Sequence, residues 1–167
     1  VKKALENAGY KDGVNLTFHY ESAQGNPATA TQIAQKFAGE NPNVIVAIAT
    51  PSAQAVAATT QDIPVVFTAV TDPLGAQVVK NLDKPGGNIT GVSDMSPLSD
   101  HLKLIQEILP SAKKIGVPYN PGEANSVVLL NALKKMAPDY GVTIVEVPAT
   151  KSSEVQDAAQ SLVGKVD

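Results

Sequence analysis

The stretch Ile63-Pro64-Val65-Val66-Phe67-Thr68-Ala69-Val70-Thr71-Asp72-Pro73 decides the fold class of this chain. It is a nearly continuous apolar run, rich in β-branched residues and bounded by prolines, which predicts a strand buried on both faces of a parallel sheet. Residues 44–49 repeat the pattern and run directly into an alanine-rich helical segment at about 51–60. Ligands bind beyond the carboxyl ends of strands in open α/β sheets, so the polar residues after both strands are candidate binding residues.

Strand and helix patterns alternate along the rest of the chain. Apolar residues at a period of two or in short β-branched runs predict strands, and apolar residues three or four apart predict helices. The predicted strands are residues 14–20, 44–49, 64–69, 89–93, 114–119 and 142–147, and the predicted helices are 1–9, 30–39, 51–60, 73–79, 98–109, 127–133 and a last one from 152. This alternation predicts an α/β fold with parallel sheets and right-handed crossovers.

Composition excludes several classes of function. The chain has 167 residues, 43% of them hydrophobic, which is enough apolar material for a core, and its net charge of −3 without a basic patch argues against nucleic acid as a partner. The absence of cysteine removes disulfides, thiolate zinc sites and cysteine nucleophiles. The two histidines lie on different elements, and no glycine-rich nucleotide fingerprint occurs, so no cofactor is predicted. Both ends look cut, and we expect a piece of a longer protein.

Five blocks taken in order make the sequence resemble a known family. They are Ala-Gln-Gly-Asn at 23–26, Ala-Ile-Ala-Thr-Pro-Ser-Ala-Gln at 47–54, Ile-Pro-Val-Val-Phe-Thr-Ala-Val-Thr-Asp-Pro at 63–73, Gly-Gly-Asn-Ile-Thr-Gly-Val-Ser-Asp at 86–94 and Tyr-Asn-Pro-Gly-Glu-Ala-Asn-Ser at 119–126. Together they resemble the bacterial ABC-transporter substrate-binding proteins of the tryptophan/tyrosine-binding type. Pro118 and Pro138 depart from the pattern.

The resemblance implies a type I periplasmic-binding-protein architecture with two Rossmann-like lobes. Residues 1–94 would then form the first lobe without its first strand, and residues 95–167 the opening part of the second lobe. The implied function is that of a non-enzymatic, extracytoplasmic and monomeric solute receptor. It would bind an aromatic amino acid (tryptophan, tyrosine or phenylalanine) between its lobes and deliver it to an ABC permease in the membrane.

An amino acid ligand makes three chemical demands on such a site. Its carboxylate requires helix N-terminal amides and hydroxyls, its ammonium requires a carboxylate, and its ring requires apolar walls. For the carboxylate we expect Thr50, Ser52 and Ala53 in one lobe with Asn125 and Ser126 in the other. For the ammonium we expect Asp72 first, then Asp94 and Glu123, and for the ring Tyr119. The predicted set also includes Asn120 in the same turn as Glu123, Ser93 at the crossover between the lobes and Asn26 at the rim of the cleft.

Each of these residues also has a purely structural interpretation. Asp72 could brace the turn at Pro73, Thr50 could begin a helix that has proline in its first turn, Glu123 to Ser126 could form a capping turn, and Asn26 could be a turn residue. Two other functions stay open from the sequence. One is the effector-sensing domain of a regulator or receptor, and the other is an enzyme that uses Asp72 and Glu123 as acid and base.

Overall fold

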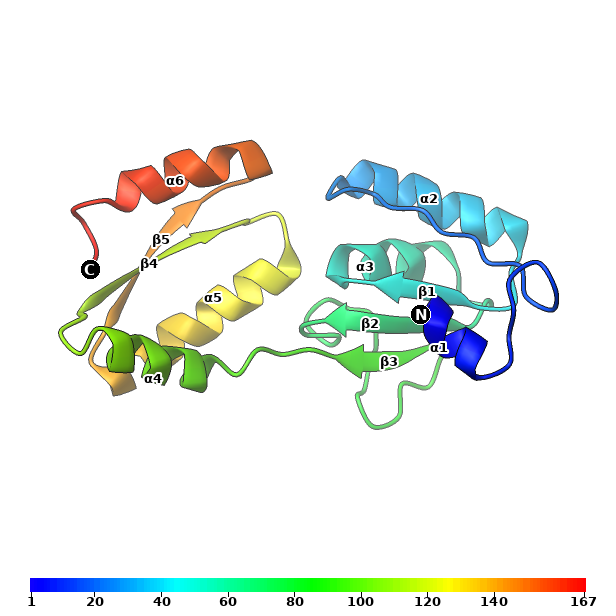
Figure 1. The fold of residues 1–167 in the computed structure, drawn as a ribbon, viewed down its shortest axis with the longest axis horizontal. Coiled ribbons are helices and arrows are strands. Elements are labelled where there is room, and N and C mark those ends of the chain that lie inside the picture. The colour runs from blue at the N-terminus through cyan, green and yellow to red at the C-terminus, as the bar shows by residue number, and fades with distance from the viewer.

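The chain forms two α/β units, each built on its own parallel sheet (Figure 1). The computed structural model describes all residues from 1 to 167. The first unit contains α1 (Lys2–Asn7), α2 (Pro27–Glu40), β1 (Ile45–Ile48), α3 (Thr50–Thr59), β2 (Val65–Val70) and β3 (Ile89–Ser93). The second contains α4 (Leu98–Ile108), β4 (Lys114–Tyr119), α5 (Ala124–Met136), η1 (Ala137–Tyr140), β5 (Thr143–Pro148), η2 (Ser152–Glu154) and α6 (Val155–Leu162). The predicted α/β fold with parallel sheets is confirmed.

The first sheet has the order β1-β2-β3, and the second pairs β4 with β5. Every pair is parallel. The connection from β3 to α4 carries the chain from one unit to the other (Figure 1). The predicted boundary between residues 94 and 95 falls in this connection and stays a prediction.

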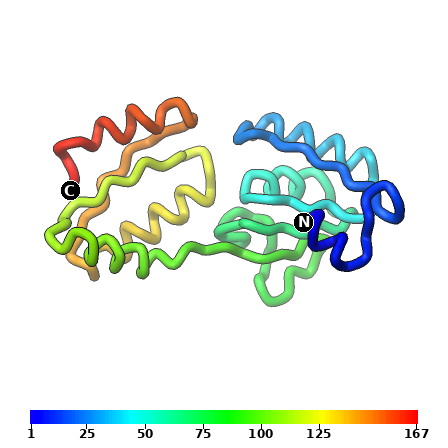
Figure 2. Tube along the Cα trace, viewed as in Figure 1, coloured from blue at the N-terminus to red at the C-terminus, as the bar shows by residue number.

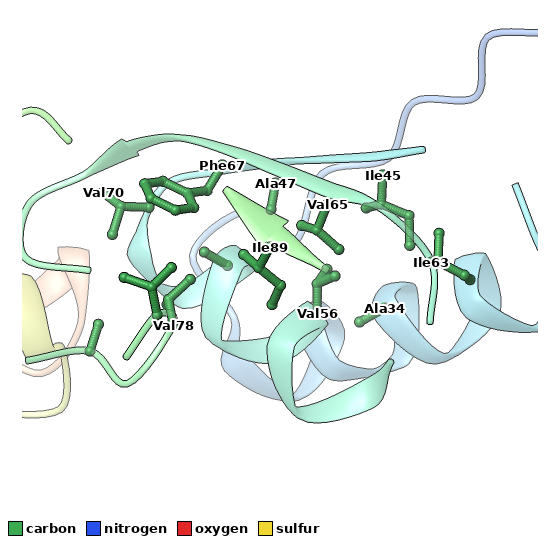
Figure 3. Packing of buried hydrophobic residues seen from close by; sticks show 13 residues of the cluster. Ala34, Ile45, Ala47, Val56, Ile63, Val65, Phe67, Val70, Val78 and Ile89 are labelled. Atoms are coloured by element: carbon green, nitrogen blue, oxygen red, sulfur yellow. The ribbon is translucent and has the colours of Figure 1, made fainter. Parts of the chain in front are cut away.

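The core of the first unit is a cluster of 13 buried residues under α2 and α3 (Figure 3). Ile45 and Ala47 of β1 and Val65 and Phe67 of β2 point into it, because alternate residues of a strand share one face. The other face is open: Val46, Ile48 and Val66 are exposed. The expectation of strands buried on both faces is therefore wrong for this chain, because its helices cover only one side of the sheet.

The end of β2 is irregular where it meets β3. The register between the two strands shifts between Phe67 and Val70, and Ala69 adopts a left-handed conformation with φ of 55°. Gly91 lies opposite Phe67, so close that a side chain at Gly91 would overlap the Phe67 carbonyl oxygen and ring. Glycine is therefore required there for the two strands to pair.

The second unit has a smaller core. Its fully buried cluster consists of Leu102, Ala137 and Val142, against which Ile115 and Leu133 pack with others. The strand predicted at residues 114–119 is confirmed despite Pro118. Thr143 and Ala149 donate their N–H groups to the carbonyls of residues 113 and 119. The backbone N–H and C=O groups of the even-numbered residues of β4 therefore point away from β5. Pro118 is one of these residues, so its missing N–H interrupts no hydrogen bond between the two strands.

Two predicted elements are absent. Residues 14–20 form no strand, because no strand of the chain lies beside them, and only an isolated bridge joins Asp12 to Leu16. Residues 73–79 form successive turns instead of a helix. There the Asp72 side chain binds the backbone N–H groups of the turn, and Gln77 has a φ of 58° that no α-helix accommodates.

Candidate functional site

An unusual backbone conformation at Ala49, and not a capping side chain, precedes the first turn of α3. Ala49 has φ of 75° and ψ of 156°, a region that L-residues rarely adopt, and Thr50 and Pro51 follow as the first residues of the helix. No side chain caps this end. The first amides of a helix have no intrahelical acceptor, so the Thr50 and Ser52 N–H groups are available to an acceptor from outside the helix. Sequence reasoning did not single out Ala49, because alanine carries no signal for positive φ.

Thr50 is the single buried polar residue of the chain, with 2% of its surface exposed. Its hydroxyl oxygen Oγ1 is buried and has no hydrogen-bond partner. An unpaired buried hydroxyl costs about 1–3 kcal/mol, so such a group is usually explained by a missing partner.

The start of α5 is shaped by side chains instead. Asn120, just after β4, donates its backbone N–H to Ser126 Oγ over 2.9 Å, and its Oδ1 accepts the N–H of Gly122 over 2.9 Å. Ser126 thereby holds the strand end against the first turn of the helix. The Asn120 amide Nδ2 donates to Glu123 Oε1 over 3.0 Å. No side chain caps α5, so the capping turn expected from Glu123 to Ser126 is wrong: these bonds tie the end of β4 to the helix start instead.

Glu123 and Asn125 complete this helix start. Asn125 Nδ2 donates to Glu123 Oε2 over 3.4 Å, while Asn125 Oδ1 is buried and has no partner. Exchanging the oxygen and nitrogen of the Asn125 amide would set an oxygen against the Glu123 carboxylate, so the orientation described is the favourable one. Thr50 Oγ1 and Asn125 Oδ1 are the two buried side-chain polar atoms of the chain that have no partner.

The two helix starts face each other. α3 contacts α5, and Figure 1 shows the N-terminal ends of the two helices directed toward one another between the units. The connection from β4 to α5 also turns toward the first unit (Figure 2). The fold therefore brings Thr50, Ser52 and Ala53 to one side of this junction and the residues from Asn120 to Ser126 to the other.

The remaining predicted residues have other surroundings. Asp72 Oδ1 accepts the N–H groups of Leu74 (3.1 Å) and Gly75 (2.9 Å), as its structural interpretation requires. Asn26 caps α2 by accepting the Thr29 N–H over 3.1 Å. Ser93 and Asp94 are exposed where the chain leaves β3, and Tyr119 is the half-buried last residue of β4. A binding role for these residues stays a prediction.

The groups whose pKa values are shifted lie away from the facing helix starts. A hydrogen bond from Lys2 lowers the pKa of Asp12, and hydrogen bonds from Thr150 lower the pKa of Glu154. Backbone N–H groups of Lys113 and Lys114 lower the pKa of Asp167. The chain contains no group of three or more acidic or histidine side chains placed to hold a metal ion. None of its helices combines the length and apolar character needed to cross a bilayer.

Three relatives resemble this chain, one by sequence comparison and two by both sequence and shape. It is 47% identical over 165 residues to a tyrosine-binding protein of Clostridioides difficile, covering 99% of this chain and 48% of the relative. A Streptococcus pneumoniae ABC domain in complex with L-Trp superposes with a TM-score of 0.94 at 34% identity, covering 99% of this chain and 56% of that one. A ligand-free, open substrate-binding protein of Clostridium difficile superposes with a TM-score of 0.67 at 46% identity, with the same coverages.

The chain thus spans about half the length of the relatives it matches. The profile of the family described as ABC transporter substrate binding protein matches residues 1–167, which is the whole chain. The parallel α/β units, the facing helix starts and this match agree with the resemblance drawn from the five sequence blocks. The chain belongs to the ABC transporter substrate-binding protein family.

Proposed function

We propose that the protein is the solute-binding component of an ABC importer and that it binds an aromatic amino acid between the units formed by residues 1–94 and 95–167. It works outside the cytoplasm as a monomer and delivers its ligand to a membrane permease. The observation that carries this proposal is the position of the two unpartnered buried oxygens, one at each of the two facing helix starts.

The α3 start provides what a carboxylate requires. Its free amides and the positive end of the helix dipole favour an anion, and the Thr50 hydroxyl adds a donor that has no other use in the fold. No acidic side chain occurs from residue 49 to residue 53 to repel that anion. Ser52 and Ala53 would line this side of the site.

The arrangement of the two units supports a closed, ligand-competent state. The chain resembles the L-Trp complex more in shape (TM-score 0.94) than the open, ligand-free relative (0.67), although the open relative is more similar in sequence. A ligand that contacts both helix starts favours the state in which they face each other, because only that state satisfies both sets of groups. Hinge motion through the connection after β3 would then open the site for release.

The aromatic specificity is inferred from the relatives. One is named a tyrosine-binding protein and another holds L-Trp. Tyr119, at the end of β4 beside Asn120, is the aromatic residue closest in the chain to the α5 start. It would provide part of the apolar wall that an indole or phenol ring requires.

The test is a calorimetric titration of the full-length natural protein with the twenty amino acids, followed by the Thr50→Val variant. We expect saturable binding of tryptophan, tyrosine or phenylalanine without turnover. Thr50→Val removes the unpaired hydroxyl, so it should raise the stability of the free protein by about 1 kcal/mol and weaken amino acid binding by about 10-fold.

Thr59→Val is the matched control. Thr59 is the last residue of α3, and its hydroxyl donates to the Ala55 carbonyl, so its loss should leave affinity unchanged. Binding of a sugar or nucleotide and of no amino acid would overturn the proposal. Consumption of the bound amino acid would favour the enzyme alternative instead.

A further inference from the structure

We propose that Glu123, with Asn125, receives the ammonium group of the ligand, so that the site recognises an α-amino acid by both ends of its zwitterion. This inference rests on the proposed function and deepens it, because it assigns the second charge of the ligand to named atoms. It departs from the sequence-based expectation, in which Asp72 is the first candidate for this role.

Glu123 is a positioned carboxylate without a cation. It is half-buried, and its two oxygens accept from the amides of Asn120 (3.0 Å) and Asn125 (3.4 Å), which fix its rotamer. No ion pair of the chain includes it. Each carboxylate oxygen has a further lone pair, so the two amide contacts leave acceptor capacity for a cation.

A second observation that points to a donor at this helix start is the unpaired oxygen of Asn125. Its Oδ1 is a buried acceptor with no partner, and it belongs to the amide that holds Glu123. An ammonium has three N–H donors and no acceptor, so it suits a carboxylate beside an unpaired amide oxygen. An anionic group would meet two repelling acceptors there.

Asp72 is engaged in its own turn. Its Oδ1 accepts two backbone N–H groups of the turn, and its Oδ2, which accepts no hydrogen bond, lies so close to Gly75 that a side chain at that position would overlap it. Asp94 is exposed where the chain leaves β3. Among the three predicted acidic residues, Glu123 is therefore the one held by side-chain amides at a helix start that faces the other unit.

The two helix starts differ in their side chains, although neither is capped by a side chain. The α3 start presents amides and the buried Thr50 hydroxyl without an acidic side chain, and the α5 start presents the Glu123 carboxylate and the Asn125 oxygen. A molecule with a carboxylate and an ammonium on one carbon matches both. A carboxylic acid without the amine would bring no cation to the half-buried Glu123 carboxylate and no donor to the Asn125 oxygen, so it should bind less tightly.

The experiment measures discrimination between two ligands in the full-length natural protein. The probes are L-tyrosine and 3-(4-hydroxyphenyl)propionate, which differ only in the amine. We expect wild type to bind L-tyrosine at least about 30-fold more tightly than the deaminated probe, since breaking a buried charge pair costs about 2 kcal/mol or more. In Glu123→Gln this ratio should fall to about 3-fold or less.

Glu107→Gln on the exposed face of α4 is the matched charge-removal control and should keep the wild-type ratio. If Glu123→Gln does not fold, Glu123→Ser serves as the second variant, because serine is a preferred residue at the N-cap position that Glu123 occupies. A ratio between ligands is also insensitive to a uniform loss of folded protein.

The outcomes separate this inference from the proposed function. If wild type binds no amino acid, both fail. If wild type discriminates and Glu123→Gln keeps the full ratio, Glu123 is not the ammonium acceptor, although the protein still binds amino acids. If Asp72→Asn, rather than Glu123→Gln, abolishes the ratio, the ammonium belongs to Asp72 and the inference is overturned.

Discussion

The two units have the same strand-to-helix pattern but hold their helix starts by different means. In the first unit, 13 buried residues pack β1 to β3 under α2 and α3. In the second, the fully buried cluster has three members, and the residues of β4 and β5 are at most half-buried. Thr50 is therefore positioned by packing and backbone conformation, whereas Glu123 is positioned by hydrogen bonds from Asn120 and Asn125.

This difference also appears at one glycine in each sheet. A side chain at Gly91 would overlap backbone and ring atoms of Phe67 in the first unit. A Cβ at Gly116 in the second unit would lie 2.7 Å from Leu162 Cδ1, the far end of a flexible side chain. At Gly91 the backbone of the first sheet would have to move to admit a side chain, whereas at Gly116 a change in the Leu162 side chain would be enough.

The largest effect should come from the first of these two glycines, with the second as its comparison. Gly91→Ala should cost about 4 kcal/mol of unfolding free energy or prevent folding, because the clash is with backbone. Gly116→Ala should cost about 1–2 kcal/mol, because Leu162 can change rotamer. Urea unfolding of both variants measures the difference. Equal costs would mean that the two units are equally rigid.

The next effect concerns the small core of the second unit. Leu102→Ala removes the largest member of a three-residue cluster and should cost about 3 kcal/mol. Leu104→Ala, two residues along α4 and 53% exposed, should cost less than about 0.5 kcal/mol. Hydrogen exchange of β2 and β5 peptides then shows where protection is lost. Loss in β2 as well as β5 would show that the units unfold together.

The smallest effect is a pH dependence in the second unit. Glu154 accepts the N–H (2.8 Å) and hydroxyl (2.9 Å) of Thr150, which holds its pKa below the ordinary value of 4.5. A lowered pKa adds stability that is present above the unfolded-state pKa and is lost as the pH falls through the folded-state pKa. The melting midpoint of Glu154→Gln should therefore fall less steeply than that of wild type between about pH 5 and pH 3. Parallel curves would show that these hydrogen bonds add nothing.

Most of the fold was predictable because β-branched runs and turn residues mark its strands clearly. The strands at 89–93 and 114–119 have the predicted bounds. Residues 14–20 show why local pattern is insufficient: alternation indicates a surface suited to pairing, but a strand also requires a neighbour. The turns at 73–79 depend on which donors the Asp72 carboxylate binds, which residue spacing does not specify.

The candidate site was predictable in outline. Parallel strands end at one edge, so residues after β1 and β4 were expected to be near a ligand, and the fold does bring Thr50 and Asn125 to facing helix starts. The choice among the three acidic residues was not predictable, because it depends on side-chain partners. The strained Ala49 was not predictable either, since only tertiary packing can hold an alanine at a φ of 75°.

Pro118 has a consequence for the outer side of β4. On that side the Lys114 carbonyl already accepts the N–H of Asp167, but Pro118 has no N–H to donate. A further strand aligned along this side would find a partner at Lys114 but would make one hydrogen bond fewer at Pro118. That loss would fall near the carboxyl end of β4, two residues before Asn120.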